Sequence, residues 1–328
     1  MKTLRNFSLE VSRLLQSRLT WLILLLTVIS PVAGLTLYKS ATAETMLSMY
    51  LANPAIAGGV VSGILFGLLT VYELDRSGRS RVDILMNAIV SPMRSALIRM
   101  LALIITAMLG LILTMLVWLP VTFTQAGAVL DMTNYCLAYL IFMGLALPCS
   151  ILAAAACYQF TQRADLSIVL FAAFAGLSLT IWANNWQLCW LNPCVWALSD
   201  DFTNFRIFRS VLYMRLTWLA ALSGVWILSW CCIRQHGKGI LGSLLRSSRR
   251  IYRPIIAVLL ITCSGVAYAA QPIVDQSNPD ETAMTFLEIP YLEGVVCTGR
   301  SAEVYPDTAA GTVTGRAAYR FLNSSGQA

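Results

Sequence analysis

Seven uncharged apolar blocks, each close to the thickness of a lipid bilayer, dominate this sequence. They cover approximately residues 19–38, 55–72, 100–123, 135–160, 166–186, 216–233 and 255–273. A helix rises about 1.5 Å per residue, so about 20 residues cross a hydrocarbon layer of roughly 30 Å. Because lipid offers the backbone no hydrogen-bond partner, such blocks must cross as helices. The sequence therefore predicts an all-α polytopic membrane protein with about seven transmembrane helices.

Composition excludes an ordinary soluble domain. Hydrophobic residues make up 58% of the 328 residues and charged residues 12%, whereas soluble domains average about 25% charged residues. A soluble fold of this composition would expose large apolar patches and aggregate. Lipid is the solvent that suits this chain.

The formal net charge of +7 is distributed by topology. Basic residues gather before the first block and between the second and third, fourth and fifth, and sixth and seventh blocks, all on one side of the membrane. The opposite loops hold fewer, namely Lys39, Arg206, Arg209 and Arg215. This asymmetry predicts a cytoplasmic N-terminus and an extracytoplasmic C-terminal tail, in a bacterial cytoplasmic (inner) membrane. The charge is a topology signal, so we expect no nucleic-acid partner.

Residues 1–18 form an expected amphipathic helix at the cytoplasmic interface. Leu4, Phe7, Val11 and Leu14 recur at helical spacing, while charged residues take the other faces.

The second block carries three glycines, Gly59, Gly63 and Gly67, at intervals of four. They line one helix face and allow close approach of another helix. Packing within the chain and packing in a dimer are both open at this stage.

The segment after the second block predicts a docking helix. Val82, Leu85, Met86 and Ile89 form an apolar stripe, while Arg81, Asp83 and Asn87 lie off it. Ser91 and Pro92 then resemble an N-cap followed by proline at the first helical position, where its missing N–H costs nothing. Such a helix could dock on a protein or lie on anionic lipid head groups.

Around this helix the chain resembles the permease subunits of type-2 ABC exporters. The resemblance rests on Glu73 closing the second span, the short helix, the Ser91-Pro92 pair, Arg94 and Arg99. An amphipathic N-terminal helix followed by six spans also matches, so the resemblance covers about residues 1–233. One departure is Arg79-Ser80-Arg81, where the family more often has a glycine-led turn.

The resemblance implies that residues 80–90 are a coupling helix seated on a separate ATPase subunit. The coupling residues would be Glu73, Arg81, Val82, Leu85, Met86, Ile89, Ser91, Pro92 and Arg94. Two ATPases and a second permease half, in a homodimer or heterodimer, would complete the exporter. ATP and Mg would bind in the ATPase, and no cofactor is expected in this chain.

The sequence predicts no catalytic or metal site. No Gly-x-x-x-x-Gly-Lys-Ser/Thr pattern occurs, and His236 is the only histidine. Cys189 and Cys194, in an extracytoplasmic loop, are a candidate disulfide, and their spacing fits no zinc site. We expect essentially no ionisable residue within the spans, with an amphipathic re-entrant helix carrying Phe202, Phe205 and Phe208 on one face.

The C-terminal third departs from the six-span pattern. Residues 234–254 form a basic cytoplasmic loop that should bind anionic lipids, and residues 255–273 form a seventh span. Residues 274–328 become acidic and extracytoplasmic, with a strand expected over 312–322 and no partner strand for it. This tail is expected to be the incomplete start of a β domain, in a fragment of a longer permease.

The sequence leaves a second class of function open. The chain could be a membrane anchor or assembly protein for an extracytoplasmic domain, without transport. An enzyme acting on lipid is a more distant alternative, because no polar catalytic set lines any span. The apolar and aromatic spans do not specify a substrate.

Overall fold

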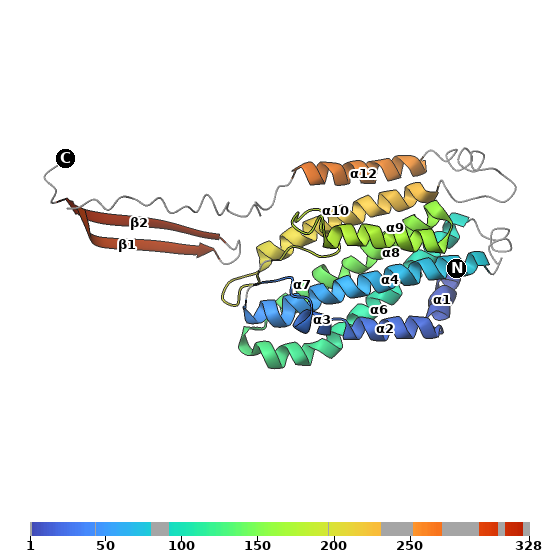
Figure 1. Ribbon diagram of the computed structural model, residues 1–328, viewed down its shortest axis with the longest axis horizontal. Coiled ribbons are helices and arrows are strands. Elements are labelled where there is room, and N and C mark those ends of the chain that lie inside the picture. Colours follow the sequence, from blue (N-terminus) through green and yellow to red (C-terminus); the bar gives the residue numbers. More distant parts are fainter. Residues whose placement is uncertain are drawn as a thin grey trace.

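The computed structural model describes residues 2–42, 44–79, 92–195, 197–230, 252–270, 295–307 and 312–323. The described part is a helical bundle followed by a small hairpin (Figure 1). Its helices and strands are α1 (Lys2–Leu15), α2 (Arg18–Ile29), α3 (Val32–Thr36), η1 (Ser48–Ala52), α4 (Asn53–Arg79), α6 (Pro92–Ala126), η2 (Gly127–Val129), α7 (Met132–Ala138), η3 (Tyr139–Gly144), α8 (Ala146–Thr161), α9 (Ala164–Leu179), α10 (Phe205–Ser229), α12 (Tyr252–Ala270), β1 (Val295–Asp307) and β2 (Thr312–Asn323).

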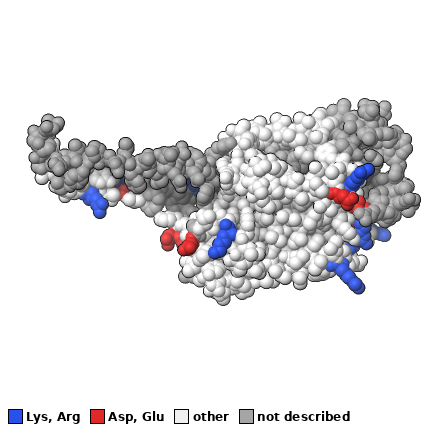
Figure 2. All heavy atoms as spheres, in the orientation of Figure 1, with Lys and Arg blue, Asp and Glu red and all other residues white. Residues whose placement is uncertain are grey.

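Five helical stretches of the described chain are long and apolar enough to cross a membrane. They are Arg18–Thr36, Ser48–Arg76, Arg94–Ala126, Met132–Thr161 and Phe205–Ser229. The blocks expected at 166–186 and 255–273 correspond to α9 and α12, which are apolar but shorter. On the face in Figure 2, charged side chains gather near the two ends of the bundle and the band between them is uncharged. That distribution suits a bundle whose middle lies in hydrocarbon and whose ends lie in water.

The two ends of the bundle differ in construction. One end, called here the N-terminal end, carries α1, the end of α4, the start of α6, the end of α10 and the start of α12 (Figure 1). The other, called here the loop end, carries residues 37–47 and the irregular segment 180–204.

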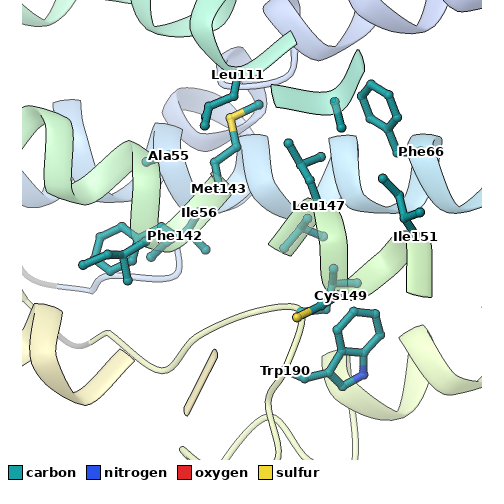
Figure 3. Packing of buried hydrophobic residues seen from close by; sticks show 14 of the residues in the cluster. Ala55, Ile56, Phe66, Leu111, Phe142, Met143, Leu147, Cys149, Ile151 and Trp190 are labelled. Atoms are coloured by element: carbon teal, nitrogen blue, oxygen red, sulfur yellow. The ribbon is translucent and has the colours of Figure 1, made fainter. Parts of the chain in front are cut away.

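The centre of the bundle is built by α4 and α8, the two most deeply buried spans. Residues of η3 and α8, among them Phe142, Met143 and Leu147, pack against Ile56 and Phe66 of α4 (Figure 3). The outer faces of α2, α6, α9 and α12 instead expose large apolar side chains such as Leu25, Leu116 and Val258. A core of this kind inside an apolar exterior is the arrangement expected of helices in lipid.

The helix α12 lies antiparallel along α10. A Cβ on Gly224 of α10 would lie 2.7 Å from the Ile261 side chain and 2.9 Å from the Ala257 carbonyl oxygen, so the two backbones approach closely. Ser264 Oγ donates to the Thr217 carbonyl at 3.0 Å, and the Tyr213 hydroxyl donates to the Ala267 carbonyl at 2.6 Å. The pattern of a small residue at the contact with polar bonds between helices is typical of membrane helix pairs.

The prediction for the sixth span was wrong in two respects. The helix α10 begins at Phe205, not near residue 216, so Arg215 lies inside it and not in a loop. Phe208 is buried, whereas Phe202 and Phe205 are 54% exposed, so these three rings do not share one face. In the sequence, Arg215 marks the start of the apolar block. The helix nevertheless extends past Arg215 toward its N-terminus, because backbone carbonyls inside the fold accept hydrogen bonds from the guanidinium.

The expected strand over 312–322 is present as β2, but it is not without a partner. It pairs antiparallel with β1, from Val295↔Asn323 to Asp307↔Thr312, with an irregularity between Cys297 and Gly299. The sequence of β1, interrupted by Gly299 and Pro306, hides its strand character. Tyr319 and Phe321 stack on one face of the hairpin and are both exposed.

The close contact at Gly59 provides a test of the bundle centre. A Cβ on Gly59 would lie 2.7 Å from the Phe142 carbonyl oxygen, while a Cβ on Gly176 of α9 would meet nothing within 4 Å. Alanine favours a helix over glycine by about 0.5–1 kcal/mol, so Gly176→Ala should leave thermal stability in detergent unchanged or higher. Gly59→Ala should lower it, because the backbone oxygen must move. Equal melting temperatures for the two variants would contradict this packing.

Candidate functional site

Four charged side chains from three helices meet at the N-terminal end of the bundle. They are Glu10 and Arg13 of α1, Glu73 near the end of α4 and Arg99 in the second turn of α6. We call this group the charged cluster. It lies at the junction of the two helices that the segment 80–91 connects.

The charged cluster is a continuous chain of ion pairs. Glu10 Oε2 accepts from Arg13 Nε at 2.5 Å, and Glu10 Oε1 accepts from Arg99 Nε at 3.3 Å. Arg13 Nη1 lies 2.7 Å from Glu73 Oε2, and Arg76 Nη1 lies 3.6 Å from Glu73 Oε1. Because Glu73 is buried, its carboxylate depends on these cations. The cluster therefore joins α1 to α4 and α6 in one network.

Apolar contacts on α1 reinforce the ion pairs. Leu14 is buried in the bundle core, and Phe7 and Val11 pack against that core. A small hollow beside them is lined by all four charged side chains together with Leu14, Leu74, Ala102 and Leu103. The predicted amphipathic helix is present, and its apolar face packs on the spans at the N-terminal end of the bundle.

The pKa of Arg13 responds to this setting. Partial burial lowers the pKa. Hydrogen bonds to Glu10 and Glu73 and the negative charges of these two carboxylates together raise the pKa by more, so the net shift is upward. The Arg13 guanidinium therefore stays charged.

Most of the predicted coupling residues lie outside the described residues. Arg81, Val82, Leu85, Met86, Ile89 and Ser91 all fall in the segment 80–91. Of the others, Glu73 is buried in the charged cluster, Pro92 begins α6 and Arg94 is exposed in its first turn. Glu10 and Arg13 were not singled out from the sequence as partners of Glu73 and Arg99; their spacing of three along one helix favours only the pairing of Glu10 with Arg13.

The three glycines of α4 face helices of the same chain. A Cβ on Gly59 would meet η3, a Cβ on Gly63 would lie 2.7 Å from Ser150 Oγ of α8, and a Cβ on Gly67 would overlap the Phe171 ring of α9. Close approach of neighbouring helices thus explains the glycine stripe.

Segment 180–204 at the loop end is irregular yet largely buried. Its Cys189, Trp190, Leu191 and Leu198 are all inaccessible to solvent. It is tied to the other loop of this end: Asp200 accepts from the Met46 and Leu47 backbone N–H groups at 2.8 and 2.9 Å. These bonds satisfy backbone donors just before η1, and they join segment 180–204 to residues 37–47.

Cys189 and Cys194 lie together in this segment. Their sulfur atoms are 3.7 Å apart, with the Cys189 thiol donating to Cys194. This hydrogen bond raises the pKa of Cys189 and lowers the pKa of Cys194. Burial and the nearby Cys194 and Cys189 raise the pKa of Tyr38 to about 12. The predicted disulfide stays a prediction, with the two thiols adjacent.

Arg215 is the residue that sequence reasoning missed. Its side chain is completely buried about 15 Å along α10 from Phe205. Nη1 donates to the Trp190 carbonyl, and Nη2 donates to the carbonyls of Phe142 at 2.9 Å and Leu191 at 3.2 Å. Nε has no partner among the described residues, and no acidic side chain there forms an ion pair with this guanidinium. The expectation of spans without ionisable residues was therefore wrong.

The described residues contain no group of three or more His, Cys, Asp or Glu side chains able to hold a metal ion.

In comparisons with known proteins, the chain matches no protein family, no curated protein and no solved structure. Function must therefore be argued from the charged cluster and the loop end.

The charged cluster is testable by a double-mutant cycle. Arg13→Gln removes the closest cation from the buried Glu73, so we expect a loss of about 1–3 kcal/mol in the free energy of unfolding. Arg13→Gln with Glu73→Gln should cost clearly less than the sum of the single changes. Unfolding in mild detergent measures this, with Arg5→Gln, an exposed position of α1, as the control. Additive losses would contradict the pairing.

The thiol pair makes a prediction about reactivity. Cys194 is partly exposed with a lowered pKa, and Cys189 is buried with a raised pKa, so Cys194 should be alkylated first. Mass spectrometry of each site over time, in reduced membranes, measures the order. Faster alkylation of Cys189 would contradict the geometry. If the pair is oxidised in native membranes, neither thiol should react until a reductant is added.

Proposed function

We propose that this chain is the transmembrane subunit of an ATP-binding-cassette exporter in a bacterial cytoplasmic membrane. In this proposal it crosses the membrane seven times, α9 and α12 included, with the charged cluster on the cytoplasmic side. A separate ATPase docks on residues 80–90, and ATP binding there drives alternating access. Two ATPases and a second permease half complete the unit.

The charged cluster is the observation that carries this proposal. A segment that receives force from a partner must be rigidly joined to the helices that it moves. Glu73 lies seven residues before the segment, Arg99 lies nine residues after it, and α1 binds both through Arg13 and Glu10. A push on residues 80–90 would therefore be transmitted to α1, α4 and α6 together.

The close packing of α4 supports a rocking motion of whole helices. Glycine contacts join α4 to η3, α8 and α9, so that α4 and its neighbours would move as a unit. Hydrolysis of ATP is assigned to the partner because the sequence has no phosphate-binding loop of the Walker type.

The hairpin β1–β2 favours a second candidate, a membrane anchor without transport. The hairpin exposes Val304, Tyr319 and Phe321, and a two-stranded hairpin alone is marginally stable in water. In that proposal the membrane helices would serve to hold an extracytoplasmic assembly, and no ATPase would bind.

Substitutions in the expected coupling helix separate the two. Met86→Glu and Ile89→Glu place a charge on the apolar stripe and should abolish co-purification of an ATPase from native membranes and substrate export. The matched control is Asn87→Glu, which adds the same charge off the stripe and should retain both. Equal membrane levels of the three variants, checked by immunoblotting, show that insertion is intact. Normal ATPase binding by Met86→Glu and Ile89→Glu would overturn the coupling assignment.

A further inference from the structure

The charge on Arg215 requires an explanation that its hydrogen bonds do not provide. Its observed partners are three backbone carbonyls, and the neutral amide of a glutamine could donate to such groups as well. A buried cation at membrane depth is costly when no counter-charge accompanies it. A positive charge that persists there without a carboxylate suits a site that receives an anion.

Two donors at this place have no acceptor. Arg215 Nε and the Trp190 indole Nε1 are both buried and without a hydrogen-bond partner among the described residues. Trp190 also provides, through its carbonyl, one of the groups that hold the guanidinium. Buried donors normally find acceptors, so each of these two donors is available to a ligand that reaches it.

The partners of Arg215 differ in how easily they can leave. Phe142 belongs to the π-helical segment η3 within a span, whereas Trp190 and Leu191 belong to the irregular segment 180–204. A guanidinium binds a carboxylate or phosphate through two parallel charge-assisted bonds, which are stronger than bonds to neutral carbonyls. An anionic group could therefore replace the two loop carbonyls without disturbing the spans.

A group of aromatic rings surrounds Trp190, whose backbone carbonyl accepts from Arg215. The Trp190 ring stacks on Phe174 with centroids 4.9 Å apart, and Phe174 meets Trp182 and Trp218 edge-on at 6.0 and 5.9 Å. Trp190 is fully buried, while Phe174, Trp182 and Trp218 are partly exposed, so the rings lead from the surface of the bundle to the residue whose carbonyl holds Arg215. Figure 3 shows the Trp190 ring near the buried core residue Cys149. An apolar body could lie along such rings while its polar head meets the arginine.

We propose that Arg215, Trp190 and the adjoining rings bind an amphiphile that carries an anionic head group, a carboxylate or a phosphate, on an apolar body. In the described conformation the carbonyls of Trp190 and Leu191 occupy the guanidinium. Rotation of these two carbonyls away from Arg215 would release the guanidinium for the ligand. That this ligand is the exported substrate rests on the proposed function, whereas its binding does not.

Tryptophan quenching tests the proposal on the full chain in phosphatidylcholine nanodiscs. The probe is dibromostearate, whose bromine atoms quench indole fluorescence on contact, and the control ligand is its uncharged methyl ester. Wild-type protein should show saturable quenching by the ionised acid, whereas the ester should produce only the gradual quenching expected from lipid contact. Equal behaviour of acid and ester in wild-type protein would overturn the proposal, and this comparison needs no variant.

Variants locate the site. Arg215→Gln should weaken the acid's apparent affinity about tenfold or more, because a charge-assisted bond is lost, and Arg215→Lys should lie between it and the wild type. The matched control, Arg209→Gln, removes an exposed arginine from the same helix and should bind as the wild type does. Trp218→Phe should reduce the quenching amplitude, because it removes one of the indoles beside the ligand. Undiminished acid binding by a folded Arg215→Gln protein would overturn the assignment to Arg215.

Two further arms identify the source of the anion and separate this proposal from the function. Phosphatidylglycerol in the nanodisc should compete with the acid if a bilayer lipid is the natural ligand, and should leave binding unchanged if a free amphiphile is. Acid-selective binding in a chain that co-purifies with no ATPase would uphold the site and refute the exporter. An ATPase partner without acid-selective binding would do the reverse.

Discussion

Every polar group in the middle of this bundle must find its partner within the protein, because lipid provides none. The backbones of the spans and most of their buried threonine side chains follow this rule. Their backbones form helices, and buried threonines donate to the carbonyl four residues earlier, as Thr70 does to Phe66 and Thr106 does to Ala102. Charged side chains collect near the two ends of the bundle (Figure 2). Arg215 is the exception: three carbonyls accept from its Nη1 and Nη2 atoms, but its Nε has no partner among the described residues.

The same constraint gives the two ends different characters. The N-terminal end is held by ion pairs among long side chains on three helices, where water is close and the charges are tolerated. The loop end is held by backbone groups and short polar side chains such as Asp200 and Asn53. In the proposed exporter, the first end would transmit the motion of an ATPase and the second would open and close the path outward. Both tasks require firmly joined elements that can shift between arrangements.

Features that depend on local pattern could be predicted from the sequence. The positions of the long apolar helices, the amphipathic α1 and the close packing of α4 at its glycines all follow from hydropathy and spacing along one segment. Features that depend on contacts between distant segments could not be predicted. The pairing of Arg13 with Glu73 joins residues sixty positions apart, and the pairing of Glu10 with Arg99 spans a still longer separation.

Arg215 and β1 show why local reasoning failed where it did. A charge beside an apolar block usually marks the membrane boundary, and only the folded segment 180–204 supplies the carbonyls that bring Arg215 inside. The glycine and proline in β1 weaken its local preference for a strand, and its pairing with β2 overrides that preference. Most of the expected coupling residues, from Arg81 to Ser91, lie outside the described part of the chain, and their role stays a prediction.

Native mass spectrometry of the complex, released gently from the membranes of the cell that makes it, tests the central claim most directly. The account predicts one assembly in which two permease subunits, at least one of them this chain, are joined by two ATPase subunits that contain a phosphate-binding loop. A mass that corresponds to this chain alone or to its homo-oligomer, with no ATPase under any gentle condition of release, would contradict it.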